Sequence, residues 1–426
     1  MRRLALKRTR SSYRSLISYY SSTTKRSSDD HNKKDKKTEE EPDNTPENSS
    51  SPTPKPFPLF VDNTLRGMSQ VVFANNPRSG LVLTAGTALV APWMGSLGLI
   101  GLVSSTATAK ILALDETTTS QGLHGYNGVL VGFALGAFLD VDFTSASEMR
   151  TCVAGLAVAG GASSTLLYHG LTKALGPSVP VWTIPFNVTT LATIAIAKPY
   201  LDQAQQAMSE SAQTVHGAAT GVAEFVGEAT SSVVQATAAG AESSSEPISA
   251  MAARAAHIVE ATELINGPLG LIIAPLTGVS QIFMVNSTLV GVCVLGALSI
   301  DHDPETDFVG GGFSFAAFGS YVGMGTALVL GGQVVELSAI TAGMVGFNPA
   351  LTALAVHTYL KPSMGGIVLA GGGAVVTTLL TVGMVPLFGA HLGGLPVCTL
   401  PFCIVAAGIV PVAKILNLEM KERSLH

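Results

Sequence analysis

The chain has 426 residues, of which 47% are hydrophobic and only 12% are charged, and its mean hydropathy is +0.41. Soluble domains usually carry about 25% charged residues, so the composition argues against a soluble protein and favours an integral protein of the lipid bilayer. The 45 glycines suit helices that pack backbone to backbone, as membrane helices do. The formal net charge is −5, and we expect no nucleic-acid partner.

Residues 1–66 predict a disordered, polar and basic N-terminal tail. They hold 14 of the 24 Lys and Arg residues against 9 acids, and they are rich in Ser, Thr, Asn, Asp and Pro. The first 28 residues contain eight Lys or Arg and no acid before Asp29, which also fits an organellar transit segment. Both interpretations, a cytoplasmic tail and a cleaved transit segment, stay open from the sequence.

Residues 67–200 predict a first membrane repeat. Its apolar runs are long enough for spanning or half-spanning helices, since about 20 residues cross the bilayer core. Prolines such as Pro77, Pro92 and Pro185 fall at the starts of or breaks in these runs, which predicts interrupted helices. The expected segments are 81–103, 123–139, 151–171 and 180–197.

Residues 201–266 predict an Ala/Ser/Glu-rich linker with short surface helices, and 267–417 a second membrane repeat. The linker has eight acids and only Arg254 among basic residues, which suggests a non-cytoplasmic location, whereas the basic N-terminus and the tail 418–426 suggest cytoplasmic ends. Each half then crosses an odd number of times, and the two repeats face opposite ways. The second-half segments are expected at 269–300, 309–332, 341–360, 364–388 and 395–413.

An internal duplication is visible in the polar residues themselves. Three landmarks recur in the same order at offsets of 211, 221 and 216 residues, which chance does not readily produce. The matched polar pairs are Gln70/Gln281, Asn75/Asn286, Asn127/Asn348 and Thr183/Thr399.

The side chains at these duplicated positions are uncharged, and this limits the class of solute that the protein can transport. Charged residues inside apolar segments would mark an ion site or a proton relay, and Glu336 is the single ambiguous case. Neutral amides and hydroxyls offer donors and acceptors without charge, which suits a small, neutral, polar solute. The aromatic residues Phe73, Tyr126 and Phe347 predict flat walls for a planar solute.

Other chemistry is weakly supported. No nucleophile–base motif, H-E-x-x-H motif or paired carboxylates lie in an apolar run, so we expect no enzyme, no catalytic residue and no cofactor. The acids between Asp301 and Asp307 are interpreted as solvated rather than metal-binding. The four cysteines are interpreted as small hydrophobic residues.

Four longer motifs carry a resemblance to a known family. Gln70 precedes Asn75-Asn76-Pro77-Arg78-Ser79-Gly80, and Gly122-Leu123-His124-Gly125-Tyr126-Asn127-Gly128 follows. Pro180-Val181-Trp182-Thr183-Ile184-Pro185-Phe186-Asn187 is echoed by Pro396-Val397-Cys398-Thr399-Leu400-Pro401-Phe402-Cys403. With these motifs the chain resembles the urea transporter family over 67–200 and 267–417.

The resemblance implies an all-α membrane protein of two inverted repeats, each with five transmembrane helices and one tilted half-length pore helix, around a central pore. It implies a homotrimer with one pore per subunit and passive, channel-type transport of urea. Gln70 and Gln281 would contact urea at the two mouths of a selectivity filter, and Thr183 and Thr399 would line its narrow centre. The walls would be Val71, Phe73, Tyr126, Ile282, Met284 and Phe347.

Three departures from that pattern change what we expect of the pore, and one of them is that the matched residues Tyr126 and Phe347 differ by a hydroxyl. The second copy of Asn-Asn-Pro reads Asn286-Ser287-Thr288, so we expect a weaker helix break there, and Met284 in place of an aromatic residue predicts a softer wall. A transporter of urea or a related amide coupled to ions or protons, and a channel that also passes ammonia or water, remain as alternatives. The expected location is the plasma membrane with cytoplasmic termini, with an organellar membrane as the alternative.

Overall fold

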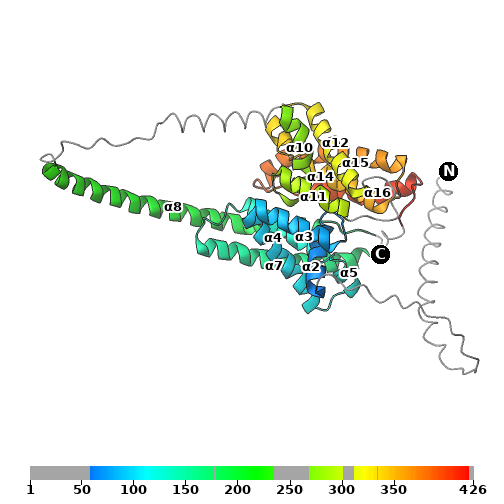
Figure 1. The fold of residues 1–426 in the computed structure, drawn as a ribbon, viewed down its shortest axis with the longest axis horizontal. Helices are drawn as coiled ribbons and strands as arrows, with labels where there is room; N and C mark the ends of the chain where they lie inside the picture. The colour runs from blue at the N-terminus through cyan, green and yellow to red at the C-terminus, as the bar shows by residue number, and fades with distance from the viewer. Residues whose placement is uncertain (1–57, 177–178, 235–267, 301–310, 333, 422–426) are drawn as a thin grey trace, which may run out of the picture. The chain divides into compact units, whose positions relative to one another are not determined.

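A computed structural model describes residues 58–176, 179–234, 268–300, 311–332 and 334–421, and within them the fold is helical (Figure 1). The one departure among these residues is an isolated antiparallel bridge between Leu360 and Met420. The first half contains α2 (Leu59–Gln70), α3 (Pro77–Val90), α4 (Pro92–Ile111), α5 (Glu116–Ser120), α6 (Gly125–Phe138), α7 (Ser147–Leu175) and α8 (Ile184–Val234). The second half contains α10 (Pro268–Ser280), the 3₁₀ turn η1 (Gln281–Phe283), α11 (Thr288–Ile300), α12 (Gly311–Leu330), α13 (Leu337–Thr341), α14 (Phe347–Tyr359), α15 (Met364–His391) and α16 (Leu400–Ile415).

The helices of the two halves match in order and in local geometry. Helices α2 to α8 correspond in turn to α10 to α16, with the five-residue helices α5 and α13 at the same place in each series. Left-handed backbone recurs at matched non-glycine positions: φ is 62° at Phe73 and 58° at Met284, and 52° at Trp182 and 50° at Cys398. Such values are costly for non-glycine residues, so their recurrence indicates one supersecondary plan folded twice.

A buried serine holds the turn that follows the first helix of each half. The Ser69 hydroxyl accepts a hydrogen bond from the Asn76 N–H (3.3 Å). The matched Ser280 hydroxyl accepts from the Ser287 N–H (3.2 Å) and lies 2.6 Å from the Val285 carbonyl.

The expected weakening of the second break is therefore wrong. Helices α10 and α11 are bent by 78° about this turn, although Thr288 replaces the proline of the first half. The serine hydroxyl and the left-handed Met284 produce the turn without proline. The first half has an additional constraint, since Pro77 opens α3 and the Asn76 side chain accepts from the Arg78 N–H (2.9 Å).

Glycine allows a very close helix contact between α4 and α6. A Cβ built on Gly132 would lie 2.0 Å from the Leu97 carbonyl oxygen. No side chain larger than hydrogen fits at that distance, so the two backbones touch directly. In contrast, a Cβ on Gly155 of α7 would meet nothing within 4 Å.

The matched helices α3 and α11 pack against each other where the two halves meet (Figure 1). Their contacts pair the start of one helix with the end of the other, so the two helices run in opposite directions. The Ser79 hydroxyl near the start of α3 donates to the Ala297 carbonyl near the end of α11 (2.7 Å). Further along α3, a Cβ on Gly86 would lie 2.8 Å from the Sγ of Cys293, which is earlier in α11. Two equivalent helices that pack antiparallel are related by a two-fold axis that is perpendicular to the helix axes and not parallel to them.

Several helices are long and apolar enough to cross a membrane. In the described part of the chain these are Ser147–Leu175, Gly311–Leu330 and Met364–His391, and the bent pair Gly270–Phe283 with Thr288–Ile300 adds a fourth if it counts as one span. Large apolar side chains on their surfaces are exposed, for example Val329 and Val368, which is expected of faces that contact lipid. The expected run 81–103 is divided, because α3 ends at Val90 and Pro92 opens α4.

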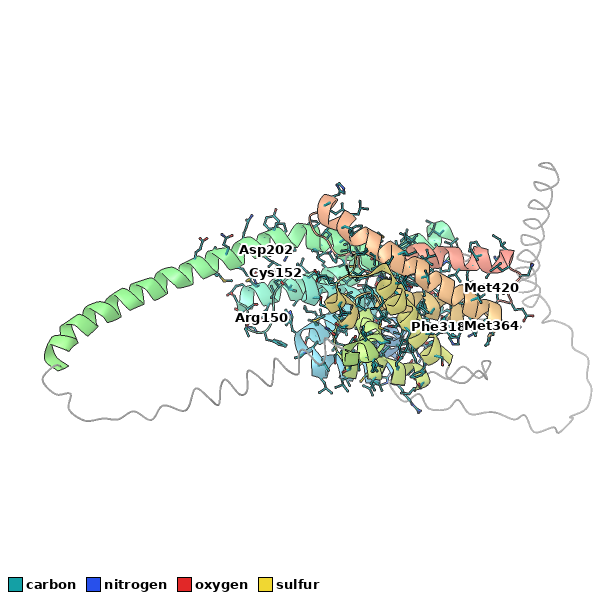
Figure 2. All side chains as sticks on the ribbon, turned by 90° about the horizontal axis from the view of Figure 1, so that it is seen from above. Arg150, Cys152, Asp202, Phe318, Met364 and Met420 are labelled. Carbon is teal, nitrogen blue, oxygen red and sulfur yellow. The ribbon has the colours of Figure 1, made fainter. Side chains whose placement is uncertain are left out.

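Helix α8 continues through the predicted repeat boundary at residue 200 and extends past the neighbouring helices (Figure 1). Lys198 pairs with Asp140 (2.7 Å), and the Gln205 amide donates to the Asp140 carbonyl (2.7 Å). Figure 2 shows Asp202 on this part of α8 beside the start of α7, which carries Arg150.

Of the predicted disordered tail 1–66, residues 1–57 lie outside the described residues, but the disorder expected over its last residues is wrong, because Leu59 begins α2 and Asn63 and Leu65 are buried in it. The linker beyond 234 and the acids 301–307 also lie outside the described residues, so the proposed domain boundaries stay predictions.

Candidate functional site

The two predicted central threonines meet. Thr183 precedes α8, Thr399 is the N-cap residue of α16, and their hydroxyl oxygens are 2.7 Å apart. Both side chains are buried, at 6% and 2% exposure. Left-handed residues immediately before them turn the chain at this point, so that the N-termini of one helix from each half face each other. The site is therefore built by both repeats together.

Two further side chains complete this centre. Asn187, in the first turn of α8, donates through Nδ2 to the Thr399 hydroxyl (2.8 Å), and its Oδ1 accepts from the Thr399 N–H (3.1 Å). Cys403, at the same point of α16, has its Sγ 3.1 Å from the Thr183 hydroxyl. The centre is thus a connected cluster of neutral hydrogen-bonding groups, with no charged side chain in it.

The matched asparagines brace this centre from the adjacent helices. The Asn127 Oδ1 accepts from the Phe186 N–H in the first turn of α8 (3.1 Å). The Asn348 Nδ2 donates to the Cys398 carbonyl just before α16 (3.0 Å). Both side chains are almost fully buried, so they fix the starts of α8 and α16 rather than offer a free surface.

The two glutamines occupy equivalent places, at the end of α2 and at the start of η1. The Gln70 Nε2 donates to the Gln121 carbonyl (2.9 Å), and the Gln281 Nε2 donates to the Ala342 carbonyl (3.1 Å). Each acceptor directly precedes the left-handed Gly122 or Gly343. These two bonds orient the side-chain amides of Gln70 and Gln281. They use only the amide nitrogens, so the amide oxygens take no part in them.

Aromatic rings from both halves surround one side of the centre. Phe73 packs edge-on against Trp182 (5.9 Å between ring centroids) and against Phe402 of the second half (6.2 Å). Tyr126 donates from its hydroxyl to the Trp182 carbonyl and packs against Tyr168 (5.9 Å). Phe73 therefore lies beside the residue that precedes Thr183, while Tyr126 holds the backbone there.

The remaining predicted wall residues differ in exposure. Val71 and Ile282 are buried at 2% and 1% exposure and belong to the apolar core. Met284 and Phe347 are partly buried and pack against that core. These observations place the four side chains in or against the apolar core, and a lining role for them stays a prediction.

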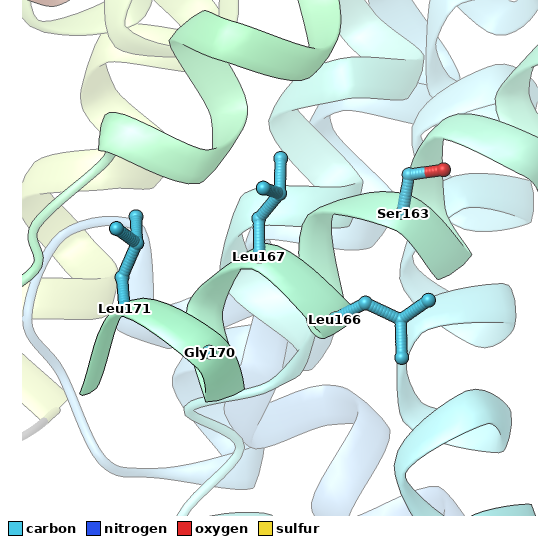
Figure 3. Close-up of a pocket in the computed structure, with 5 residues that line it drawn as sticks. All are labelled: Ser163, Leu166, Leu167, Gly170 and Leu171. Carbon is cyan, nitrogen blue, oxygen red and sulfur yellow. The ribbon is translucent and has the colours of Figure 1, made fainter. Parts of the chain in front are cut away.

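One surface hollow lies elsewhere, on α7 (Figure 3). It has a volume of about 530 Å³ and is lined by Ser163, Leu166, Leu167, Gly170 and Leu171. All five residues come from the surface of one helix, and only Ser163 has a polar side chain. Because it contains none of the matched polar residues, we assign it to the membrane-facing surface and not to the functional site.

Sequence reasoning missed three members of the site. Asn187 was noted only within a motif, Trp182 was not given a role, and Cys403 was interpreted as a small hydrophobic residue. The offset of 216 residues that links Thr183 to Thr399 also links Asn187 to Cys403, and it was the signal available. Asp62 was also overlooked; it is an acid at 2% exposure in α2, paired with Arg66 (2.7 Å).

These features define a helical integral membrane protein built from two repeats, with a neutral polar site where the repeats meet. The family model described as "Urea transporter" matches residues 61–242 and 230–414. The chain belongs to the urea transporter family.

Individual relatives give the same assignment over different lengths. Urea transporter 1 of Rattus norvegicus is 37% identical over 142 residues, which is 32% of this chain and 34% of that protein. Urea transporter 1 of Mus musculus is 36% identical over 142 residues, again 34% of that protein. Urea transporter 1 of Ovis aries is 28% identical over 363 residues, 81% of this chain and 75% of that protein. The matches thus span about a third of the rodent proteins and three quarters of the sheep protein.

Proposed function

We propose that this protein is a passive channel for urea, with the path running past the central threonines Thr183 and Thr399. The observation that carries the proposal is their direct contact (2.7 Å) across the two repeats of a chain in this family. A solute at that point would meet neutral hydrogen-bonding groups and no charge. A transport role also accounts for the lack of catalytic motifs.

The antiparallel packing of α3 and α11 supports the inverted arrangement of the repeats. Because these equivalent helices contact each other in opposite directions, the two-fold axis that relates them crosses their length. If the helices cross the bilayer, this axis lies in the membrane plane, and the two repeats have opposite orientation. The central site then lies near the membrane midplane, as the proposal requires. The count of five spans and one pore helix per repeat belongs to the proposal as well.

The chemistry of the site fits a planar solute with N–H donors. Urea has four N–H hydrogens and one carbonyl, and it must exchange its water for other partners to pass. The hydroxyl oxygens of Thr183 and Thr399, and the amide oxygens of Gln70 and Gln281, are acceptors that can receive those N–H groups. An intramolecular hydrogen bond contributes about 1 kcal/mol net, so each acceptor changes the barrier modestly and several act together.

A coupled transporter is less well supported than a channel. Glu336, the one acid considered for coupling, is exposed and lies at the start of α13, 3.3 Å from the Ser338 hydroxyl. The buried Asp62 is already paired with Arg66 on its own helix. We include in the proposal the homotrimer and the plasma membrane location with cytoplasmic termini, which follow from the resemblance.

The test is stopped-flow urea efflux from proteoliposomes that contain the purified full chain. Wild type is compared with Thr183→Val, Thr399→Val and Gln281→Leu, and with the control Thr193→Val. The Thr193 hydroxyl lies on α8 but bonds its own helix, at the Thr189 carbonyl (2.7 Å), so valine there removes no contact of the centre.

We expect fast urea flux that generates no current and no pH change. Each central threonine substitution should slow it about fivefold or more, since one net hydrogen bond of about 1 kcal/mol is lost, and the control should stay close to wild type. Urea flux that is altered by none of the substitutions at Thr183, Thr399 and Gln281 would reject the residue assignments. No urea flux from intact, folded protein would reject the proposed function, and urea flux with a coupled current would favour the transporter alternative.

A further inference from the structure

The centre of the site is not symmetric, although the fold around it is. Asn187 and Cys403 occupy matched positions, the fourth residue of α8 and the fourth of α16. Each lies one turn beyond its central threonine, Thr183 or Thr399. The first repeat therefore supplies an amide and the second supplies a thiol at the same point, and these groups differ in what they can hold.

The amide of Asn187 forms a clamp on the opposite repeat. Its Oδ1 accepts from the Thr399 N–H (3.1 Å), while its Nδ2 donates to the Thr399 hydroxyl (2.8 Å) and to the Thr183 carbonyl (2.8 Å). The backbone N–H of Thr399 is an obligatory donor, so the orientation of the amide is fixed with its oxygen toward that N–H. With the Asn187 side chain fully buried, no water competes for these bonds.

The orientation of the amide fixes one bond of the Thr399 hydroxyl and connects it to the other polar groups of the centre. The Asn187 Nδ2 can only donate, so the Thr399 oxygen accepts there. The Thr399 oxygen also lies 2.7 Å from the Thr183 oxygen, which is 3.1 Å from the Cys403 sulfur, and either atom can be the donor in each of these two contacts. Sulfur is a weak hydrogen-bonding partner, so the chain of contacts from Asn187 through Thr399 and Thr183 ends at the weakly bonding thiol of Cys403 in the second repeat.

We propose that Asn187 is a positioning residue that makes the two central hydroxyls present acceptor lone pairs to a passing solute, and that Cys403 is its weak counterpart. The inference rests on the proposed function. An N–H-rich solute can then replace the bond between Thr183 and Thr399 by bonds to the same oxygens, while Asn187 keeps Thr399 in place. The amide thus determines preference for solutes with many N–H groups, beyond the part played by the threonines.

The pseudo-two-fold symmetry provides a sharp test, because the amide can be moved to the other repeat. The variants are Asn187→Cys and the swap Asn187→Cys/Cys403→Asn, in which the new amide would hold Thr183 as Asn187 holds Thr399. The matched control is Thr193→Cys, which places a cysteine on α8 away from the centre. Urea and formamide flux are measured in proteoliposomes, and melting temperature in detergent reports folding.

We expect Asn187→Cys to lower urea flux about tenfold and to lower the ratio of urea to formamide flux, because formamide has fewer N–H groups to satisfy. The swap should recover both quantities to within about threefold of wild type, and Thr193→Cys should change neither. If Asn187 merely capped or packed against the start of α16, an asparagine at position 403 could not take over that role, and the swap would not restore urea flux. A swap no better than Asn187→Cys, with both proteins folded, would overturn the inference.

A second variant covers the case in which Asn187→Cys does not fold. Asn187→Ser keeps a small polar side chain that cannot reach both the N–H and the hydroxyl of Thr399, and the same losses are expected. Unchanged flux and unchanged ratio in folded Asn187→Ser would also overturn the inference. If wild type itself carries no urea, the proposed function fails, and that result is distinct from one in which wild type carries urea and the Asn187 variants match it.

Discussion

The turn between α10 and α11 positions Gln281, and its stability can be perturbed at one atom. In Ser280→Ala the Ser287 N–H loses its acceptor (3.2 Å), and the Val285 carbonyl loses the hydroxyl 2.6 Å away. Ser280 is fully buried, so these groups are left without water. Unsatisfied buried polar groups cost about 1–3 kcal/mol each, and we expect a loss of about 2 kcal/mol in the free energy of unfolding.

The matched Ser69→Ala is expected to cost less, about 1 kcal/mol. The first-half turn has a second support, because Pro77 fixes the backbone at the start of α3 and Asn76 caps it. The same reasoning predicts that Thr288→Pro stabilises the protein. Proline is favoured in the first position of a helix, and a compatible proline adds about 0.4–1 kcal/mol.

The assay is reversible unfolding of the purified protein by SDS titration in mixed micelles, followed by the fluorescence of its tryptophans. The predicted order of stability is Thr288→Pro, wild type, Ser69→Ala, Ser280→Ala. Equal losses at the two serines, or a destabilised Thr288→Pro, would refute the claim that serine replaces proline in holding the second turn. Urea flux should fall in Ser280→Ala, since the turn positions Gln281.

Two further predictions concern packing and capping. Gly132→Ala should prevent folding or cost several kcal/mol, because its Cβ would lie 2.0 Å from a backbone oxygen of α4. The control Gly155→Ala on α7 should be neutral or stabilising, since its Cβ meets nothing within 4 Å. The yield of folded protein after detergent extraction, compared between the two variants, measures the difference. Asp115 caps α5, and hydrogen bonds from Thr118 hold the pKa of its carboxyl below the ordinary 3.8. Its stabilising effect is then present above about pH 4 and lost as the pH falls through the lower folded value, so wild type and Asp115→Ala should converge in melting temperature on acidification.

Much of the fold could be predicted because the internal duplication is recognisable from polar residues that recur at matched positions in the sequence. Gln70/Gln281 and Thr183/Thr399 fixed the correspondence between halves, and the helices of the structure follow it. The low charge indicated a membrane protein, and the family assignment supports that. Prolines such as Pro77 and Pro92 do begin helices, as their positions indicated.

What the sequence concealed are contacts between residues that are distant along the chain. The hydroxyl of Ser280 that replaces a missing proline leaves no motif, because serine is common and its role depends on burial. The bond from Asn187 to Thr399 joins residues 212 apart, and only the folded interface of the repeats shows it. The continuity of α8 past residue 200 was hidden because its Ala-rich sequence is compatible with both helix and linker.

The central claim is that the two repeats form one path at the contact between Thr183 and Thr399. A double-mutant cycle on urea flux tests it most directly, with Thr183→Val, Thr399→Val and the double variant in proteoliposomes. The two side chains share one hydrogen bond (2.7 Å), so the account predicts non-additive effects: each single variant slows flux about fivefold, and the double variant is slowed about fivefold to tenfold. A double variant slowed by the product of the two single effects, or unchanged flux throughout, would contradict a shared central site.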